Sequence, residues 1–418
     1  MHRRQERPRS ARGWHAVMRF VRPLVAQAAL LWVAACGGGG DGAGQPEITF
    51  AASLLPAEQA KYNTILDEFT RQTGIPVKLV AVQYAQIRSS VEAEAQAGRG
   101  KLDLVELDLP QLPVMRPLMQ PLDGITSGIE ALRDAVAEGA WEVTTAPGAG
   151  GAERTLYLPH RLNWQAMVYD SEKLPEPPGT WEELLAAARA HAGAIGLKCA
   201  RYEGLICDVF PFIWQAGGDP LRPDSAEVVQ AIEFLRELSA YFNPAVRSYQ
   251  ETPVLEAQRL GEIVLHFNWP FVVPLLREQK LLPSPMKVAP LPAGPAGRAT
   301  VLGGGYLGIP AAAPHREQAA RLMEFLTSVE GQRSLVRELG WFPMREEGWA
   351  AMSAADRELY AGYLAMRREV RARPAVADYD ALSRRWQDAI YEILFEGADV
   401  KGRLKALQSE IEEPGAEG

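Results

Sequence analysis

The 418-residue sequence lacks the short motifs that identify several enzyme classes. It contains no Gly-x-Ser-x-Gly, no His-Glu-x-x-His and no P-loop, and its six histidines are scattered without metal-ligand spacing. No apolar run approaches the roughly 20 residues that a membrane-spanning helix needs. We therefore expect no catalytic residues, no metal and no cofactor.

The longest apolar stretch, Leu24–Ala35, lies between an arginine-rich leader and the sequence Cys36-Gly-Gly-Gly-Gly40. This order is typical of a secretion signal. The segment Val33–Cys36 resembles the bacterial lipobox. The resemblance implies that residues 1–35 are a signal peptide, that Cys36 is the lipidated first residue of the mature chain, and that residues 36–45 include a flexible Gly-rich tether. We expect an extracytoplasmic protein, in the periplasm or at the cell surface, held at a membrane by its lipid.

Basic residues are scarce outside the leader. The whole chain has a formal net charge of −8, while the leader holds seven Arg and one Glu, so the remainder carries about −14. Nucleic-acid binding needs clustered Lys and Arg. We therefore expect no nucleic acid among the partners.

Cysteine is also rare, because only Cys199 and Cys207 remain after Cys36. An even pair in an oxidising compartment suggests a disulfide, which would stabilise the fold by roughly 2–3 kcal/mol. The alternative is a pair of small buried residues with free thiols. We favour the disulfide.

The segment after the tether alternates between strand and helix patterns. Glu47–Ala51 predicts a strand, and a helix follows that ends at Gly74. Further elements follow in the order strand, helix, strand: residues 77–81, 84–97 and 102–107. This rhythm predicts an α/β domain with a mostly parallel sheet.

Later helices carry clearer signals. Thr180 to Glu183 has the capping-box form, and Asp224-Ser225 precedes another apolar stripe. Apolar residues repeat at helical spacing over residues 382–394 and 400–411, which indicates core-facing helices rather than a cofactor motif.

Two patterns have a catalytic and a non-catalytic interpretation. Gly303–Gly308 formally matches Gly-x-Gly-x-x-Gly, but Pro310 is incompatible with the helix that a dinucleotide site requires. The glycines instead predict a close approach by a neighbouring side chain or a ligand. Glu106 and Asp108 could serve acid–base chemistry, but carboxylates at such spacing more often bind ligands or face solvent.

Five stretches together resemble the sugar-binding group of extracellular solute-binding proteins of ABC importers, which includes the maltose- and trehalose-binding proteins. The resemblance runs over nearly the whole mature chain and rests on residues 69–77; 102–108 with 118–123; 156–169 with 180–184; 212–219; and 289–292 with 303–310 and 340–345.

The resemblance implies a two-lobe periplasmic-binding-protein fold of type II. Each lobe would be a mostly parallel sheet flanked by helices, and the ligand would lie in a cleft at the hinge. Residues 46–155 and 288–340 would form the first lobe, and residues 156–287 and 341–412 the second. The implied partners are a small sugar and the transmembrane subunits of an ABC permease, and the implied state is a monomer.

Sugars offer an apolar face to aromatic rings and hydroxyls to carboxylates, amides and Arg. From the family's cleft positions the resemblance gives the following ligand-binding candidates: Asp108, Glu106, Arg161, Asn163, Trp164, Trp269, Gly304, Gly305, Tyr306, Trp341, Arg345, Tyr84 and Trp214. Core packing is the alternative for each aromatic residue, and for Trp214 the two interpretations are about equal.

The chain departs from the family at its first loop. Ala51–Leu55 replaces a Trp-containing turn, which suggests a smaller sugar or a solute that is not a sugar. We expect a lipoprotein that captures a disaccharide or short oligosaccharide for import. The alternatives are a polyol, a glycerophosphodiester or a polyamine as solute, a sensory subunit that presents its ligand to a receptor, and an extracytoplasmic glycosidase using Glu106 and Asp108.

Overall fold

The computed structural model describes residues 45–54, 56–148, 151–280, 285–349, 352–376 and 378–412. All of them lie within one compact unit, Gly44–Gly418. The expected signal peptide, Cys36 and nearly all of the tether lie outside the described residues. Among the helices that are described, none combines the length and the apolar character needed to cross a membrane.

The first sheet has the order β12-β11-β3-β1-β2, with β6 also paired to β11. Its strands β1, β2 and β3 are parallel, as the sequence rhythm predicts, whereas β11 runs antiparallel to both β3 and β6. The strand bounds are β1 Ile48–Ala52, β2 Val77–Ala81, β3 Leu104–Asp108, β6 Tyr157–Trp164, β11 Thr300–Gly308 and β12 Val370–Arg371.

Helices from both ends of the chain pack on this sheet. Helix α1 packs on β2 and on α11, while α2 packs on β1 and β3 and α10 packs on β6. The bounds are α1 Pro56–Thr73, α2 Tyr84–Gln96, α3 Leu112–Met115, α4 Ile129–Ala135, α10 Arg316–Thr327 and α11 Val329–Leu339, with single 3-10 turns at Leu109–Gln111 (η1), Arg116–Leu118 (η2) and Glu138–Ala140 (η3). Sheet and helices together form the first lobe. A two-stranded ribbon, β4 Thr145–Pro147 and β5 Glu153–Thr155, precedes β6.

The second sheet has the order β10-β7-β9-β8. Only β8 and β9 are parallel, and β7 is antiparallel to β9 and β10, so the expected mostly parallel sheet is replaced here by a mainly antiparallel one. The bounds are β7 Ala166–Asp170, β8 Ile195–Gly196, β9 Leu265–Asn268 and β10 Met286–Ala289.

The second lobe adds the remaining helices to this sheet, except α12 (Glu346–Trp349), which packs on α11 of the first lobe. Helix α6 packs on α7 and α15, α16 packs on α7 and α15, and α14 covers β7 and β10. The bounds are α5 Trp181–Ala190, α6 Glu203–Gln215, α7 Ala226–Ser239, α8 Glu251–Arg259, α9 Val272–Glu278, α12 Glu346–Trp349, α13 Ala354–Leu359, α14 Ala361–Ala365, α15 Tyr379–Phe395 and α16 Val400–Glu412, with 3-10 turns at Val246–Ser248 (η5) and Arg367–Glu369 (η6).

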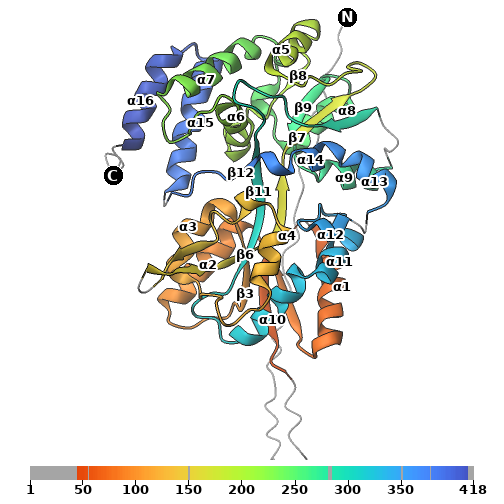
Figure 1. Ribbon diagram of the computed structural model, residues 1–418, viewed down its shortest axis with the longest axis vertical. Coiled ribbons are helices and arrows are strands. Elements are labelled where there is room, and N and C mark those ends of the chain that lie inside the picture. Colours follow the sequence, from red (N-terminus) through yellow and green to blue (C-terminus); the bar gives the residue numbers. More distant parts are fainter. Residues whose placement is uncertain are drawn as a thin grey trace, which may run out of the picture. The chain divides into compact units, whose positions relative to one another are not determined.

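The chain passes between the sheets several times, and β6 and β11 lie side by side where it does so (Figure 1). Strand β6 still belongs to the first sheet, and β7 begins the second only one residue after it, at Ala166. The first passage therefore falls at Gln165 and not at the expected residue 156. The shift has a simple cause, since the whole of β6 pairs with β11.

Several local signals have the predicted outcome. Gly74 follows α1 with a φ of +72°, as a helix-terminating glycine should. The Thr180 hydroxyl accepts from the Glu183 amide, although the Glu183 carboxylate reaches back to Gly179 rather than to Thr180. The late apolar stripes are buried, with Trp386 fully inside the core.

The structure corrects the expected disulfide, because Cys199 and Cys207 are both free and buried. They flank a different contact, the ion pair between Lys198 and Asp208, whose side chains are completely buried. The Lys198 ammonium also donates to the carbonyl of Phe267 at 2.8 Å. This pair joins the end of β8 to α6 and β9 without a covalent bridge.

Breaking this pair tests its contribution. Lys198→Met should lower the free energy of unfolding by about 3–5 kcal/mol, because it leaves the Asp208 carboxylate buried without its cation. The double variant Lys198→Met/Asp208→Leu should recover part of the loss, since no charge is then buried. Urea unfolding measures both, and a loss below about 1 kcal/mol in the single variant would contradict the assignment.

Candidate functional site

A buried carboxylate organises the region where β3, β6 and β11 meet. Glu106 of β3 is completely buried, and its Oε1 accepts hydrogen bonds from Tyr84 at 2.7 Å and from Arg161 at 2.8 Å. Its Oε2 faces Nδ1 of His160 at 3.5 Å. Glu106 therefore has no surface to offer a ligand and instead fixes the side chains around it.

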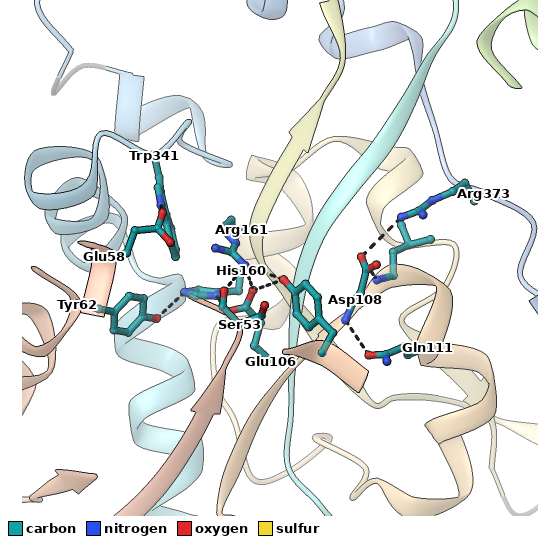
Figure 2. Close-up of polar contacts among 12 residues, drawn as sticks. Ser53, Glu58, Tyr62, Glu106, Asp108, Gln111, His160, Arg161, Trp341 and Arg373 are labelled. Atoms are coloured by element: carbon teal, nitrogen blue, oxygen red, sulfur yellow. Dashed lines mark hydrogen bonds and ion pairs between the residues drawn. The ribbon is translucent and has the colours of Figure 1, made fainter. Parts of the chain in front are cut away.

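Arg161 of β6 is held mainly through one nitrogen (Figure 2). Its Nη2 donates to the Ser53 carbonyl at 2.9 Å and to the Tyr84 hydroxyl at 2.7 Å, as well as to Glu106. No described residue accepts from its Nε or Nη1. The guanidinium is thus fixed in place with further donors unused.

Trp341 forms one wall of the site. The guanidinium carbon of Arg161 lies 4.4 Å from the centre of the Trp341 ring, a cation–π distance. The Trp341 Nε1 donates to Glu58 at 2.7 Å. Tyr62 packs on the other members of this group, 5.7 Å from Trp341 and hydrogen-bonded to His160 at 3.0 Å. The indole is therefore oriented by at least three neighbours.

Three successive glycines of β11 allow these groups to approach. A Cβ at Gly305 would stand 1.8 Å from Glu106 Oε1, and one at Gly303 would stand 2.7 Å from the Trp269 ring. Gly304 has a φ of +127°, and its Cβ would meet the Arg161 carbonyl at 1.8 Å. The close approach predicted from the glycine motif is confirmed, and the neighbours are side chains and backbone of the site itself.

Asn163 and Trp269 complete this face. Asn163 lies two residues after Arg161, on the same side of β6, and its Oδ1 would stand 2.7 Å from a Cβ at Gly303. Both side chains are partly exposed. Neither the Asn163 amide nor the Trp269 Nε1 makes a hydrogen bond within the described part of the chain. Both are free to bind a polar molecule.

A second charged group lies beside the first. The Arg373 side chain is 4% exposed and pairs with Glu203 at 2.7 Å and, more loosely, with Asp108 Oδ1 at 3.6 Å. Tyr379 donates to Glu203 at 2.6 Å and Ser383 donates to it at 2.5 Å. Asp108 ends β3 of the first lobe, whereas Glu203 begins α6 of the second, so Arg373 bridges the two lobes.

The two carboxyls of β3 are tuned in opposite directions. Burial would raise the pKa of Glu106, but Arg161, His160 and the Tyr84 hydroxyl lower it to about 2. Burial raises the pKa of Asp108, Arg373 opposes that rise and the charge of Glu203 adds to it. Glu106 thus stays ionised at neutral pH and cannot act as a general acid there.

The structure brings Glu106, Asp108, Arg161, Asn163, Trp269, Trp341, Tyr84, Gly304 and Gly305 to this region. It corrects three predicted ligand contacts, because Glu106, Trp164 and Tyr306 are 0%, 1% and 0% exposed. The Trp164 Nε1 donates to the Tyr363 carbonyl and Tyr306 donates to the Ala140 carbonyl, so both polar tips are used inside the core.

Two other candidates lie in different surroundings. Arg345 contacts the Thr327 carbonyl and Glu347 instead of the Glu106 group. Trp214 is 6% exposed and lines a separate cavity of about 910 Å³ together with residues 136–139, 142, 367, 368 and 370–372. No three His, Cys, Asp or Glu side chains among the described residues are grouped so as to hold a metal ion.

The sequence reasoning missed several members of the site: Glu58, Tyr62, His160, Glu203, Arg373 and Tyr379. Regular alternation along β6 would place His160 on the face opposite Arg161, and its contact with Glu106 occurs where the pairing of β6 with β11 shifts in register. Arg373 and Glu203 are 170 positions apart, and nothing in the sequence indicates their contact.

A two-lobe α/β fold with fixed donors, open amide and indole groups and aromatic walls defines a ligand-binding protein. The family comparison agrees with this class. The chain belongs to the bacterial extracellular solute-binding proteins, whose family model matches residues 64–355.

Individual relatives give the same picture. A Deinococcus radiodurans protein named "Probable ABC transporter-binding protein" is 24% identical over 395 residues, which cover 87% of this chain and 92% of the relative. Among solved structures, the maltose-bound MalE3 of T. maritima is 25% identical, with a TM-score of 0.72 and coverage of 88% of this chain and 99% of that one. The sugar-binding protein MalE of Xanthomonas citri shares the fold at 19% identity, with a TM-score of 0.74 and coverage of 87% and 96%.

The low pKa of Glu106 predicts a pH-dependent stability. Its ordinary value is 4.5 and its folded value is about 2, so the stabilisation is complete above pH 4.5 and is lost as the pH falls toward 2. Glu106→Gln should therefore cost on the order of 3 kcal/mol near pH 7, and this cost should shrink steadily between pH 4.5 and pH 3.

Urea unfolding of both proteins across this pH range measures the difference. Asp388→Asn is the matched control, because it removes a half-exposed carboxylate paired with Arg201 and should cost less than about 1 kcal/mol. A cost of Glu106→Gln that stays constant from pH 7 to pH 3 would show that the carboxylate is not held ionised.

Proposed function

We propose that this chain is the solute-capturing lipoprotein of an ABC importer and that its solute is a sugar, most simply a disaccharide or short oligosaccharide. It would bind the sugar between its lobes, deliver it to the transmembrane permease subunits and leave it chemically unchanged.

The observation that carries the proposal is the set of unused polar groups beside aromatic rings at the passage between the lobes. Arg161 offers Nε and Nη1, Asn163 offers an amide and Trp269 offers its indole N–H, and no described residue occupies these groups. Arg161 is fixed by the buried Glu106, so its donors are oriented before any ligand arrives.

This arrangement suits a sugar. Its hydroxyls both donate and accept, which matches a guanidinium, an amide and a carboxylate placed close together. Its C–H faces pack on aromatic rings, and Trp269, Trp341 and Tyr84 are each partly exposed.

The comparisons support the same solute and the same transport role. The solved T. maritima relative holds maltose, and the D. radiodurans relative is named for an ABC transporter. The paired state of Glu106 supports binding over glycoside hydrolysis, because one of the two β3 carboxylates is buried and already bonded to Arg161.

Sugar capture predicts a ligand-dependent melting temperature. A disaccharide at 100 times its dissociation constant should stabilise the protein by about 2.7 kcal/mol. Trp269→Ala and Asn163→Ala should each weaken binding at least about tenfold, equivalent to 1.4 kcal/mol. Tyr391→Ala is the aromatic control, because its ring stacks with Arg201 and Arg247 away from these groups.

Thermal-shift screening followed by calorimetry makes this measurement with disaccharides, monosaccharides, polyols, glycerophosphodiesters and polyamines. A response only to compounds that are not sugars would keep the binding role and overturn the sugar. Hydrolysis of a chromogenic glycoside would overturn the binding-only proposal.

The lipid anchor has its own test. Cys36→Ser should abolish incorporation of radiolabelled palmitate and release the protein from the membrane fraction, because Cys36 is the proposed acylated residue. Cys199→Ser serves as the control. The Cys199 thiol is buried inside the fold, so its replacement should have no effect on anchoring. Membrane retention and labelling of Cys36→Ser would refute the anchor.

A further inference from the structure

The charges around the site do not cancel. Glu106, Asp108 and Glu203 supply three carboxylates, whereas Arg161 and Arg373 supply two guanidiniums. These carboxylates exceed the guanidiniums by one negative charge. These residues act on one another, because the charges of Arg373, Glu203 and Arg161 all reach Asp108.

Most of the carboxylate oxygens are already engaged. Glu203 accepts from Arg373 and Tyr379 on Oε1 and from Ser383 on Oε2. Glu106 is enclosed and Glu58 holds Trp341. The Glu58, Glu106 and Glu203 groups are thus part of the frame of the site.

Asp108 differs from them. Its Oδ1 accepts from the Leu109 amide at 2.9 Å and faces Arg373, and its carboxylate also caps η1 toward the Gln111 amide, while no hydrogen bond from a described side chain reaches its Oδ2. Its side chain is 31% exposed, far more than the buried Glu106. Asp108 is therefore the carboxylate of this group that is best placed to meet an incoming charge.

Neither guanidinium provides a corresponding place for an anion. Arg161 forms an ion pair with Glu106 at 2.8 Å, and Arg373 forms one with Glu203 at 2.7 Å. The positive charge of each guanidinium is therefore balanced before a ligand binds. A phosphate or carboxylate on the ligand would enter a region with excess negative charge and lose its hydration shell there.

We propose that the solute is a sugar that carries a protonated amino group, and that this ammonium binds the Asp108 carboxylate. The inference rests on the proposed sugar-binding function and narrows it to amino sugars. The sugar ring would use Arg161, Asn163 and Trp269 as described, and the ammonium would neutralise the surplus negative charge.

The state of Asp108 is consistent with this assignment. Burial and the neighbouring Glu203 raise the pKa of Asp108, which means that its negative charge is under-compensated in the free protein. A ligand cation at Oδ2 supplies the missing compensation. A neutral hydroxyl there offers a hydrogen bond without the charge.

The test compares ligands that differ only in charge. Maltose, cellobiose and trehalose are each titrated into the purified protein by calorimetry at pH 7, together with their amino-deoxy and uronic-acid counterparts. On the preferred skeleton, the amino sugar should bind at least about tenfold more tightly than the neutral parent and the uronic acid at least about tenfold more weakly. Added salt should reduce both differences.

Asp108→Asn should remove the preference while keeping the shape of the side chain. The ratio of the two dissociation constants, amino sugar against parent, should fall to less than about threefold, with a smaller change for the parent itself. Asp388→Asn, which removes one negative charge on α15 outside this group, should leave the ratio unchanged.

The outcomes separate the two proposals. Equal binding of neutral and amino sugars, or tighter binding of the uronic acid, would overturn the amino-sugar assignment and leave sugar capture intact. A preference for amino sugars that persists in Asp108→Asn would overturn the role of Asp108. Binding of spermidine without binding of any sugar would overturn the sugar function itself.

Discussion

The site depends on the missing side chains of β11. Gly303 and Gly305 leave room for Trp269 and for the Glu106 carboxylate, and Gly304 takes a φ that other residues rarely adopt. Because β11 pairs with both β3 and β6, these glycines lie between the strand that supplies Glu106 and the strand that supplies Arg161. A single methyl group at Gly305 would displace Glu106 and, with it, the fixed position of Arg161. The geometry of the donors is therefore set by backbone pairing rather than by loops.

Buried charge has two different uses in this chain. Lys198 and Asp208 are enclosed in the second lobe, with all their bonds directed at the protein, so they serve the fold alone. Glu106 is equally buried, but its partner Arg161 is 17% exposed at the side chain and keeps unused donors. A buried anion that holds a partly exposed cation gives a rigid donor at the surface of the site. The desolvation of Glu106 is offset by Arg161, Tyr84 and His160 together, which is reflected in its low pKa.

Features that depend on neighbours close in the sequence could be predicted, whereas contacts between distant residues could not. Helix caps at Thr180 and Ser225, the terminating Gly74 and the periodic late helices depend on neighbours a few residues away, and the sequence contains all of that information. Trp164 shows what was overlooked at short range: side chains alternate along β6, so Arg161 and Asn163 share one face and Trp164 must take the other. Tyr306 is buried for the same reason, next to the glycines of β11. The contact of Arg373 with Glu203 and Asp108 depends on the passage of the chain between the lobes, which no local pattern records.

The position of Arg373 between the two lobes also affects what happens when the lobes move. Arg373 pairs with Glu203 of the second lobe at 2.7 Å, and Glu203 also accepts a hydrogen bond from Tyr379 of α15. The distance from Arg373 to Asp108 of the first lobe is longer, at 3.6 Å. If the lobes move relative to one another, the longer contact is the one that yields, because Glu203 is also held by Tyr379 and Ser383. Asp108 would then lose its nearest cation while remaining partly exposed. A ligand cation that binds Asp108 replaces that lost compensation, so ligand charge and lobe position act on the same carboxylate. Such coupling ties the choice of solute to the conformational change that solute-binding proteins use.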